Sequence, residues 1–142
     1  MKPTSLRVLL VDDNPVDLEL AHAAFSEQSE HTHLTTLGSG AATLTYLRDP
    51  AHARPDVVLL DIHMPLMSGF EVLQTIKGDP ALQTIPVVML STSANPLDTE
   101  LAYRLFASSY LVKEASLDAF QNQVEAFVRY WEQCKVARQV AD

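Results

Sequence analysis

The sequence predicts an α/β protein in which a doubly wound parallel sheet of five strands carries helices on both faces. Five short aliphatic runs recur along the 142 residues, and the segments between them have helical patterns. Runs that are apolar at successive positions are typical of strands buried on both faces of a parallel sheet. Right-handed crossovers between such strands place the connecting helices on both sides.

The five predicted strands are read from these aliphatic runs. Two acids end the first run after four apolar residues, which is too soon for a signal peptide. The other runs follow at intervals that leave room for one helix each. The expected strands are residues 6–11 (LRVLLV), 33–37 (HLTTL), 56–60 (DVVLL), 85–90 (IPVVML) and 109–112 (SYLV).

The first four predicted helices have recognisable start signals. Residues 14–17 (NPVD) and 95–98 (NPLD) each give an asparagine cap, a proline at the first helical position and an acid at the third. Glycines open the other two helices, which are expected at residues 40–48 and 69–77.

The fifth predicted helix begins near Ser116, and its apolar residues are spaced by threes and fours as far as Cys134. We expect it to reach Val136 or beyond. About twenty residues span roughly 30 Å, more than is needed to cover a strand of about 17 Å. The end of this helix is therefore expected to contact another chain. Cys134 is the only cysteine, so no internal disulfide can form.

Length, composition and charge set the broad class. The hydrophobic fraction is 47%, the charged fraction is 20%, and no segment is long enough to cross a membrane. We expect one cytoplasmic domain over residues 1–142, with its core at about 6–131 and a helix extension or tail at 132–142. Ten Lys and Arg against eighteen Asp and Glu give a net charge of −8, which argues against nucleic acid as a partner.

Unusual polar residues follow four of the five predicted strands. Asp12 and Asp13 follow the first strand, Asp61 the third, Ser91 ends the fourth, and Lys113 follows the fifth. In an open parallel sheet these carboxyl ends meet at the edge where ligands bind. Each residue alone has an ordinary structural role. Because asparagines already cap the helices at 14–17 and 95–98, we expect the two adjacent acids not to be needed for local structure and to be functional instead.

Three carboxylates at one edge need a cation. At ~4 Å and an effective dielectric near 20, two like charges repel by about 4 kcal/mol. Oxygen ligands of this kind suit Mg²⁺, which also takes phosphate oxygens as ligands. A lysine and a hydroxyl would complete a phosphoryl-binding site, in which an aspartate can attack phosphorus and form an acyl phosphate.

The motifs that carry these residues resemble the receiver domain of two-component response regulators. The resemblance covers residues 6–131 and implies the flavodoxin-like (βα)5 fold. Four segments match in order and at the family's spacings: VLLVDDNPVD (8–17), VVLLDIHMPLMSGFEVL (57–73), IPVVMLST (85–92) and YLVK (110–113).

The resemblance implies a role for each matching residue. Asp61 would accept a phosphoryl group from a sensor histidine kinase, and Ser91 and Lys113 would contact that group. Mg²⁺ would be bound by Asp13, Asp61 and the backbone carbonyl of His63, with Asp12 acting mainly through water. No organic cofactor is implied. The chain would catalyse its own phosphorylation and dephosphorylation only, so it would not be an enzyme acting on a metabolite.

The resemblance also implies how the signal leaves the domain. Tyr110 matches the family's switch aromatic, which turns inward as Ser91 is drawn toward phosphate. This makes the face formed by residues 96–131 the expected output surface. Short features such as VDDNPVDLEL, LSTS and the pair at 130–131 resemble single-domain regulators of bacterial and cyanobacterial phytochromes, a subgroup that tends to form homodimers through the same face.

Glu114, Thr92 and residues 108–109 depart from the family pattern. Glu114 stands where a proline usually follows the lysine, so the loop is expected to lack its usual cis peptide bond. His63 and Ser93 stand at positions that tune hydrolysis in this family, so the lifetime of the phosphorylated state is left open.

The sequence also allows several other interpretations. A small Mg²⁺-dependent phosphatase of the haloacid dehalogenase type also uses an aspartyl nucleophile, but on its first strand with a second acid two positions on. A dinucleotide-binding module would need glycines where this chain has DDNP. A phosphate-independent interaction module would keep the fold without the chemistry. His31 and His33 could bind metal, but a solvated strand face explains them better.

Overall fold

The computed structural model describes residues 5–28, 30 and 32–137, and it has the predicted five-stranded parallel sheet. The strand order is β2-β1-β3-β4-β5, so the sheet grows in both directions from β1. The strands are β1 (Leu6–Val11), β2 (Thr32–Leu37), β3 (Val57–Leu60), β4 (Val87–Ser91) and β5 (Ser109–Val112). Every residue of β3 and β4 is buried, as expected for a central strand between two helical layers.

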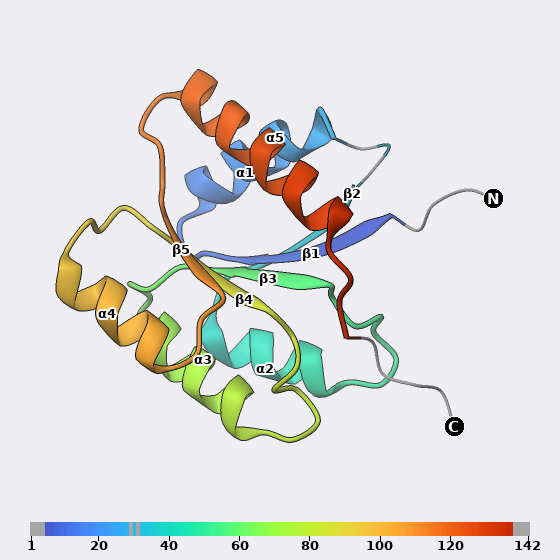
Figure 1. Ribbon diagram of the computed structural model, residues 1–142, viewed down its shortest axis with the longest axis vertical. Helices are drawn as coiled ribbons and strands as arrows, with labels where there is room; N and C mark the ends of the chain where they lie inside the picture. Colours follow the sequence, from blue (N-terminus) through green and yellow to red (C-terminus); the bar gives the residue numbers. More distant parts are fainter. Residues whose placement is uncertain (1–4, 29, 31, 138–142) are drawn as a thin grey trace.

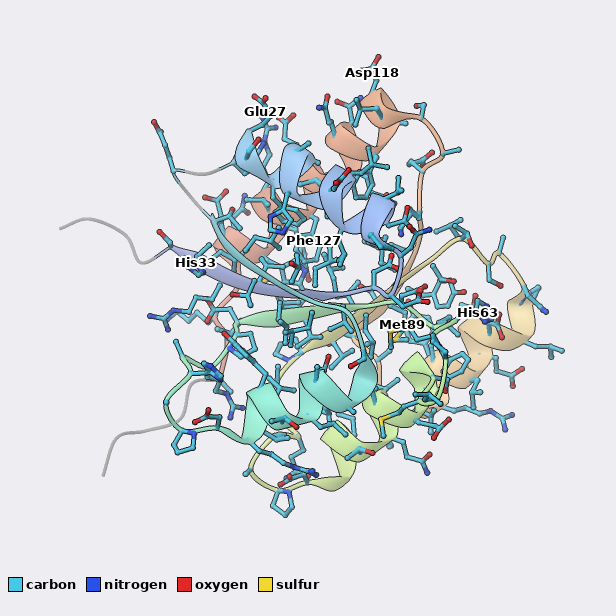
Figure 2. The ribbon with its side chains drawn as sticks, turned by 180° about the vertical axis from the view of Figure 1, so that it is seen from behind. Glu27, His33, His63, Met89, Asp118 and Phe127 are labelled. Atoms are coloured by element: carbon cyan, nitrogen blue, oxygen red, sulfur yellow. The ribbon has the colours of Figure 1, made fainter. Side chains whose placement is uncertain are left out.

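Five helices form the two outer layers (Figure 1). One layer consists of α1 (Pro15–Ser26) and α5 (Leu117–Gln133). The opposite layer consists of α2 (Gly40–Arg48), α3 (Gly69–Gly78) and α4 (Pro96–Arg104). The core is correspondingly divided in two by the sheet. Figure 2 shows Phe127 on the α1–α5 side and Met89 on the other side.

The helix starts follow the predicted capping chemistry. The side chain of Asn14 accepts a hydrogen bond from the Val16 N–H, and that of Asn95 accepts one from the Leu97 N–H. Ser68 adds a cap that the sequence reading did not identify, because it forms a reciprocal capping box with Glu71. These caps fix where each helix leaves the loop that borders the carboxyl edge of the sheet.

The prediction that the last helix reaches Val136 is wrong. α5 ends at Gln133, and Cys134 is its extended C-cap with φ −81° and ψ 142°. Its apolar stripe packs on the sheet through four buried residues, Phe120, Val124, Phe127 and Val128. Trp131 is the last residue of α5 in the apolar cluster on this face of the sheet, so core packing does not extend the helix further. None of the helices between residues 5 and 137 has both the length and the apolarity of a membrane span.

Candidate functional site

The strand order brings the predicted polar residues to one edge of the sheet. β1 pairs with β3, β3 with β4, and β4 with β5, all in parallel, so their carboxyl ends lie side by side. One carboxylate oxygen from each of Asp12, Asp13 and Asp61 lies within 4.8 Å of the others. The ammonium of Lys113 lies 2.8 Å from Asp12 Oδ2. The three acids and Lys113, which were expected at one site, therefore meet there.

The three carboxylates differ in burial, and Asp61 is the perturbed one. Asp12 is buried, Asp61 is half-buried and Asp13 is exposed. The pKa of Asp61 is raised to about 6, first by burial and then by the charge of Asp12, against a lowering by Lys113. The protein thus holds Asp61 where its negative charge is disfavoured. Three acids at this spacing fit a hard divalent cation, which would offset the repulsion between them.

Lys113 is held by two acids rather than one. Its ammonium donates to Asp12 Oδ2 at 2.8 Å and to Asp17 Oδ2 at 3.1 Å. Burial alone would lower the pKa of Lys113, but hydrogen bonds and charges from both acids outweigh it and raise that pKa. Sequence reading assigned Asp17 only to the first turn of α1. Its second role depends on a residue 96 positions away, which no local pattern reveals.

Asp12 also has a structural role that the sequence reading did not assign. Its Oδ1 accepts a hydrogen bond from the Asn14 N–H at 3.0 Å, which shapes the turn from β1 into α1. The inference that the adjacent acids are not needed for local structure is therefore wrong for Asp12. One carboxylate both orients the turn and pairs with Lys113.

Ser91 and Tyr110 are linked through Ser93. Ser91 is fully buried, and its Oγ accepts a hydrogen bond from the Ser93 N–H at 3.1 Å. The hydroxyl of Tyr110 donates to the Ser93 carbonyl at 2.8 Å, while the ring is half-buried against the core under α4. Ser93 Oγ donates to Asp98 Oδ2 at 2.7 Å. The loop after β4 is thereby tied to both β5 and α4.

His63 lies on the outer side of the site, beside α4 (Figure 2). Its side chain is 65% exposed, and its Nε2 lies 3.9 Å from Asp98 Oδ2. The loop that carries it folds back closely, since the Gly69 N–H donates to the Ile62 carbonyl at 2.8 Å. A β-carbon on Gly69 would overlap the carbonyl of Asp61, so only glycine fits there.

Two weaker sequence features are also located. His33 is exposed at the opposite end of the molecule from His63 (Figure 2), away from the acidic cluster, and His31 lies outside the described residues. The expected absence of a cis bond before Glu114 agrees with the backbone, because the described residues contain no cis peptide bond.

The chain is similar to known proteins over most of its length. A family model described as response regulator receiver domain matches residues 8–125. The chain is 37% identical to the probable methanogenesis regulatory protein FilR2 of Methanothrix harundinacea, covering 87% of this chain and 82% of that protein. It is 33% identical to the response regulator Rcp1 of Synechocystis, covering 87% of each.

Solved structures agree with these matches. The phosphorylated cyanobacterial phytochrome response regulator RcpA superposes with a TM-score of 0.88 at 33% identity, covering 95% of this chain and all of that one. The Mn(2+)-bound form of Rcp1 superposes with a TM-score of 0.84 at 31% identity, covering 94% and 99% of the two chains. The match in length and fold extends over almost the whole of each relative.

Proposed function

Because the chain belongs to the response regulator receiver family and resembles phytochrome response regulators over nearly its whole length, we propose that it is phosphorylated on Asp61 by a sensor histidine kinase. The observation that carries this proposal is the half-buried Asp61, whose carboxylate lies among Asp12, Asp13 and Lys113. Phosphorylation would change its contacts with other proteins. The similarity to RcpA, which is named as a phytochrome response regulator, favours a phytochrome-type kinase as the donor.

The proposed function requires a single phosphoryl transfer at this site. A carboxylate oxygen of Asp61 attacks the phosphorus of a phosphohistidine, and the P–N bond breaks with its electron pair left on the imidazole nitrogen. That nitrogen takes up a proton from solvent as the neutral imidazole leaves. The pKa of about 6 leaves Asp61 mainly ionised at neutral pH, as a nucleophile must be. The Lys113 ammonium and the Ser91 hydroxyl would contact the transferred oxygens.

The acidic cluster would hold Mg²⁺ through Asp13, Asp61 and the backbone carbonyl of His63. Asp12 would act mainly through water. Such an ion, when bound, neutralises charge on the phosphoryl oxygens. The chain itself supplies the carboxylates and excludes bulk water from Ser91 and Asp12, which are both buried. A solved relative binds Mn²⁺, which favours a divalent cation here as well.

The side chains around the phosphoacceptor suit a protein donor. Leu66, in the loop after Asp61, is fully exposed with φ 69°, a strained conformation for a leucine. Val16 and Leu20 on α1, and Leu117 at the start of α5, are exposed as well. Exposed apolar side chains beside a polar rim are typical of a protein-binding surface. A small-molecule substrate would not need them.

The output surface would be the face of α4, β5 and α5, and it would bind a second copy of the chain. Movement of Ser91 toward the phosphoryl group would disturb Ser93 and release the Tyr110 hydroxyl. Besides Leu117, six large apolar side chains on or beside these elements are exposed: Leu97, Leu101, Tyr103, Phe106, Val112 and Tyr130. The pairs Glu100–Arg104 and Glu125–Arg129 supply both charges on α4 and α5, which suits a symmetric contact.

The test is phosphorylation by a small donor. With acetyl phosphate and Mg²⁺, the mass should rise by one phosphoryl group, and Asp61→Asn should not gain it. Asp49→Asn, at an exposed acid after α2, is the matched control and should behave as the native protein. Chromatography before and after phosphorylation then separates a phosphate-dependent dimer from a phosphate-independent interaction module. Steady turnover of a phosphate ester would instead support the phosphatase reading.

A further inference from the structure

The backbone on both sides of Lys113 is held by one side chain of α5. Gln123 Nε2 donates to the Val112 carbonyl at 2.9 Å, and its Oε1 accepts from the Glu114 N–H at 3.3 Å. Only one orientation of the amide satisfies both partners, because its nitrogen must donate and its oxygen must accept. The two hydrogen bonds bracket Lys113 at the point where β5 ends.

The bond to Glu114 exists because this residue is not proline. Proline has no N–H, so a chain with the family's usual residue at this position could not make that contact. Proline would restrict the backbone through its ring. In this chain the backbone at the same stretch is restricted instead by the side chain of Gln123, which extends from α5.

The N–H and the ammonium of Lys113 itself are held by β4, by Asp12 and by α1. Its N–H donates to the Ser91 carbonyl at 2.7 Å, and its ammonium is bound by Asp12 and by Asp17 at the start of α1. The Lys113 side chain is only 13% exposed. Two of its three ammonium hydrogens are thus engaged, which leaves one to reach Asp61 or a group bound to it.

We propose that Gln123 is a positioning residue for phosphoryl transfer. Gln123 holds the backbone on both sides of Lys113, so that the Lys113 ammonium points toward the phosphoryl group. This inference rests on the proposed function. It also connects the site to α5, which carries part of the proposed output surface. A displacement of α5 by a partner would shift Lys113, and engagement of Lys113 by phosphate would act back on α5.

Kinetics of the full chain with acetyl phosphate test this role. Gln123→Ala removes both hydrogen bonds and should slow phosphorylation at least about fivefold, the factor that corresponds to loss of one typical hydrogen bond. Its affinity for Mg²⁺, measured by calorimetry, should be unchanged, because Gln123 contacts none of the three acids. Asn122→Ala, at the exposed neighbouring position of α5, should match the native protein. Exchange of the Glu114 amide hydrogen should accelerate in Gln123→Ala only.

A second variant separates positioning from general loss of structure. Glu114→Pro placed in the Gln123→Ala background restores restriction of the loop without needing an N–H, so the rate should recover by at least half. If the native protein and Gln123→Ala were phosphorylated at the same rate, the inference would be overturned and the proposed function would stand. Equal losses of rate and Mg²⁺ affinity, with no recovery in the double variant, would also overturn it. Native protein that takes up no phosphoryl group would overturn both.

Discussion

Replacing Asp61 by Asn should stabilise the metal-free protein at neutral pH. The pKa of Asp61 is raised from 3.8 to about 6, first by burial and then by the charge of Asp12. A carboxyl group with a higher pKa in the folded state holds its proton more tightly when folded. Ionised Asp61 therefore opposes folding, and this penalty grows as the pH rises from about 3.8 through about 6.

The size of the effect follows from that shift. In a fully buried site, the difference between the two pKa values corresponds to about 3 kcal/mol. Asp61 is only half-buried, and solvent screening reduces this to about 1–2 kcal/mol. Asn has the same shape without the charge, so Asp61→Asn should recover this amount. For a chain of this length the gain corresponds to a rise in Tm of about 5 °C.

The measurement is thermal unfolding of both proteins in a chelating buffer between pH 3 and pH 8. The two Tm values should coincide near pH 3 and separate as the pH rises. Added Mg²⁺ should then narrow the gap, because the ion stabilises the native protein through Asp61. An Asp61→Asn protein that is no more stable than the native protein at pH 7.5, with a difference that does not change with pH, would refute the reasoning.

Three further substitutions test the surrounding structure, each by urea unfolding at pH 7.5. Gly69→Ala should lose roughly 3 kcal/mol because its β-carbon would overlap the Asp61 carbonyl, whereas Gly78→Ala, with no atom within 4 Å, should lose nothing. Phe106→Gly should gain about 0.5–1 kcal/mol, since Phe106 has φ 70° and is 74% exposed; an unchanged value would mean that its backbone is not strained. Lys113→Met should lose roughly 2–3 kcal/mol by leaving two acids unpaired, and added Mg²⁺ should restore more stability to it than to the native protein.

The fold could be predicted because each strand carries its own signal. A run such as residues 57–60 is apolar at every position, and only a strand between two helical layers can bury all of it. The predicted ends of strands and helices are wrong where something other than the apolar pattern determines them. The fourth strand begins at Val87 rather than at residue 85 because Pro86 has no N–H for the sheet. The end of α5 was misplaced because an apolar pattern does not tell where the sheet beneath it ends.

The edge residues could be predicted for a related reason. Asp12 and Asp61 stand directly after the buried strands β1 and β3, and Lys113 stands directly after the edge strand β5. Parallel strands place their carboxyl ends at the same edge. No comparable rule applies to Asp17 or Gln123. Each lies on a helix, and its role is set by which backbone or side chain that helix faces after folding.

Asp17 and Gln123 both hold the segment around Lys113, Asp17 through the ammonium and Gln123 through the backbone of the two neighbouring residues. Lys113 lies near the end of an edge strand, so β4 supports it on one side only. A residue in that place needs contacts from elsewhere if its ammonium is to keep a fixed direction. Those contacts come from α1 through Asp17 and from α5 through Gln123. The precision of the proposed phosphoryl site therefore depends on how two neighbouring helices pack. Substitutions in the α1–α5 core, such as Phe127→Ala, should slow phosphorylation while leaving every residue of the acidic cluster in place.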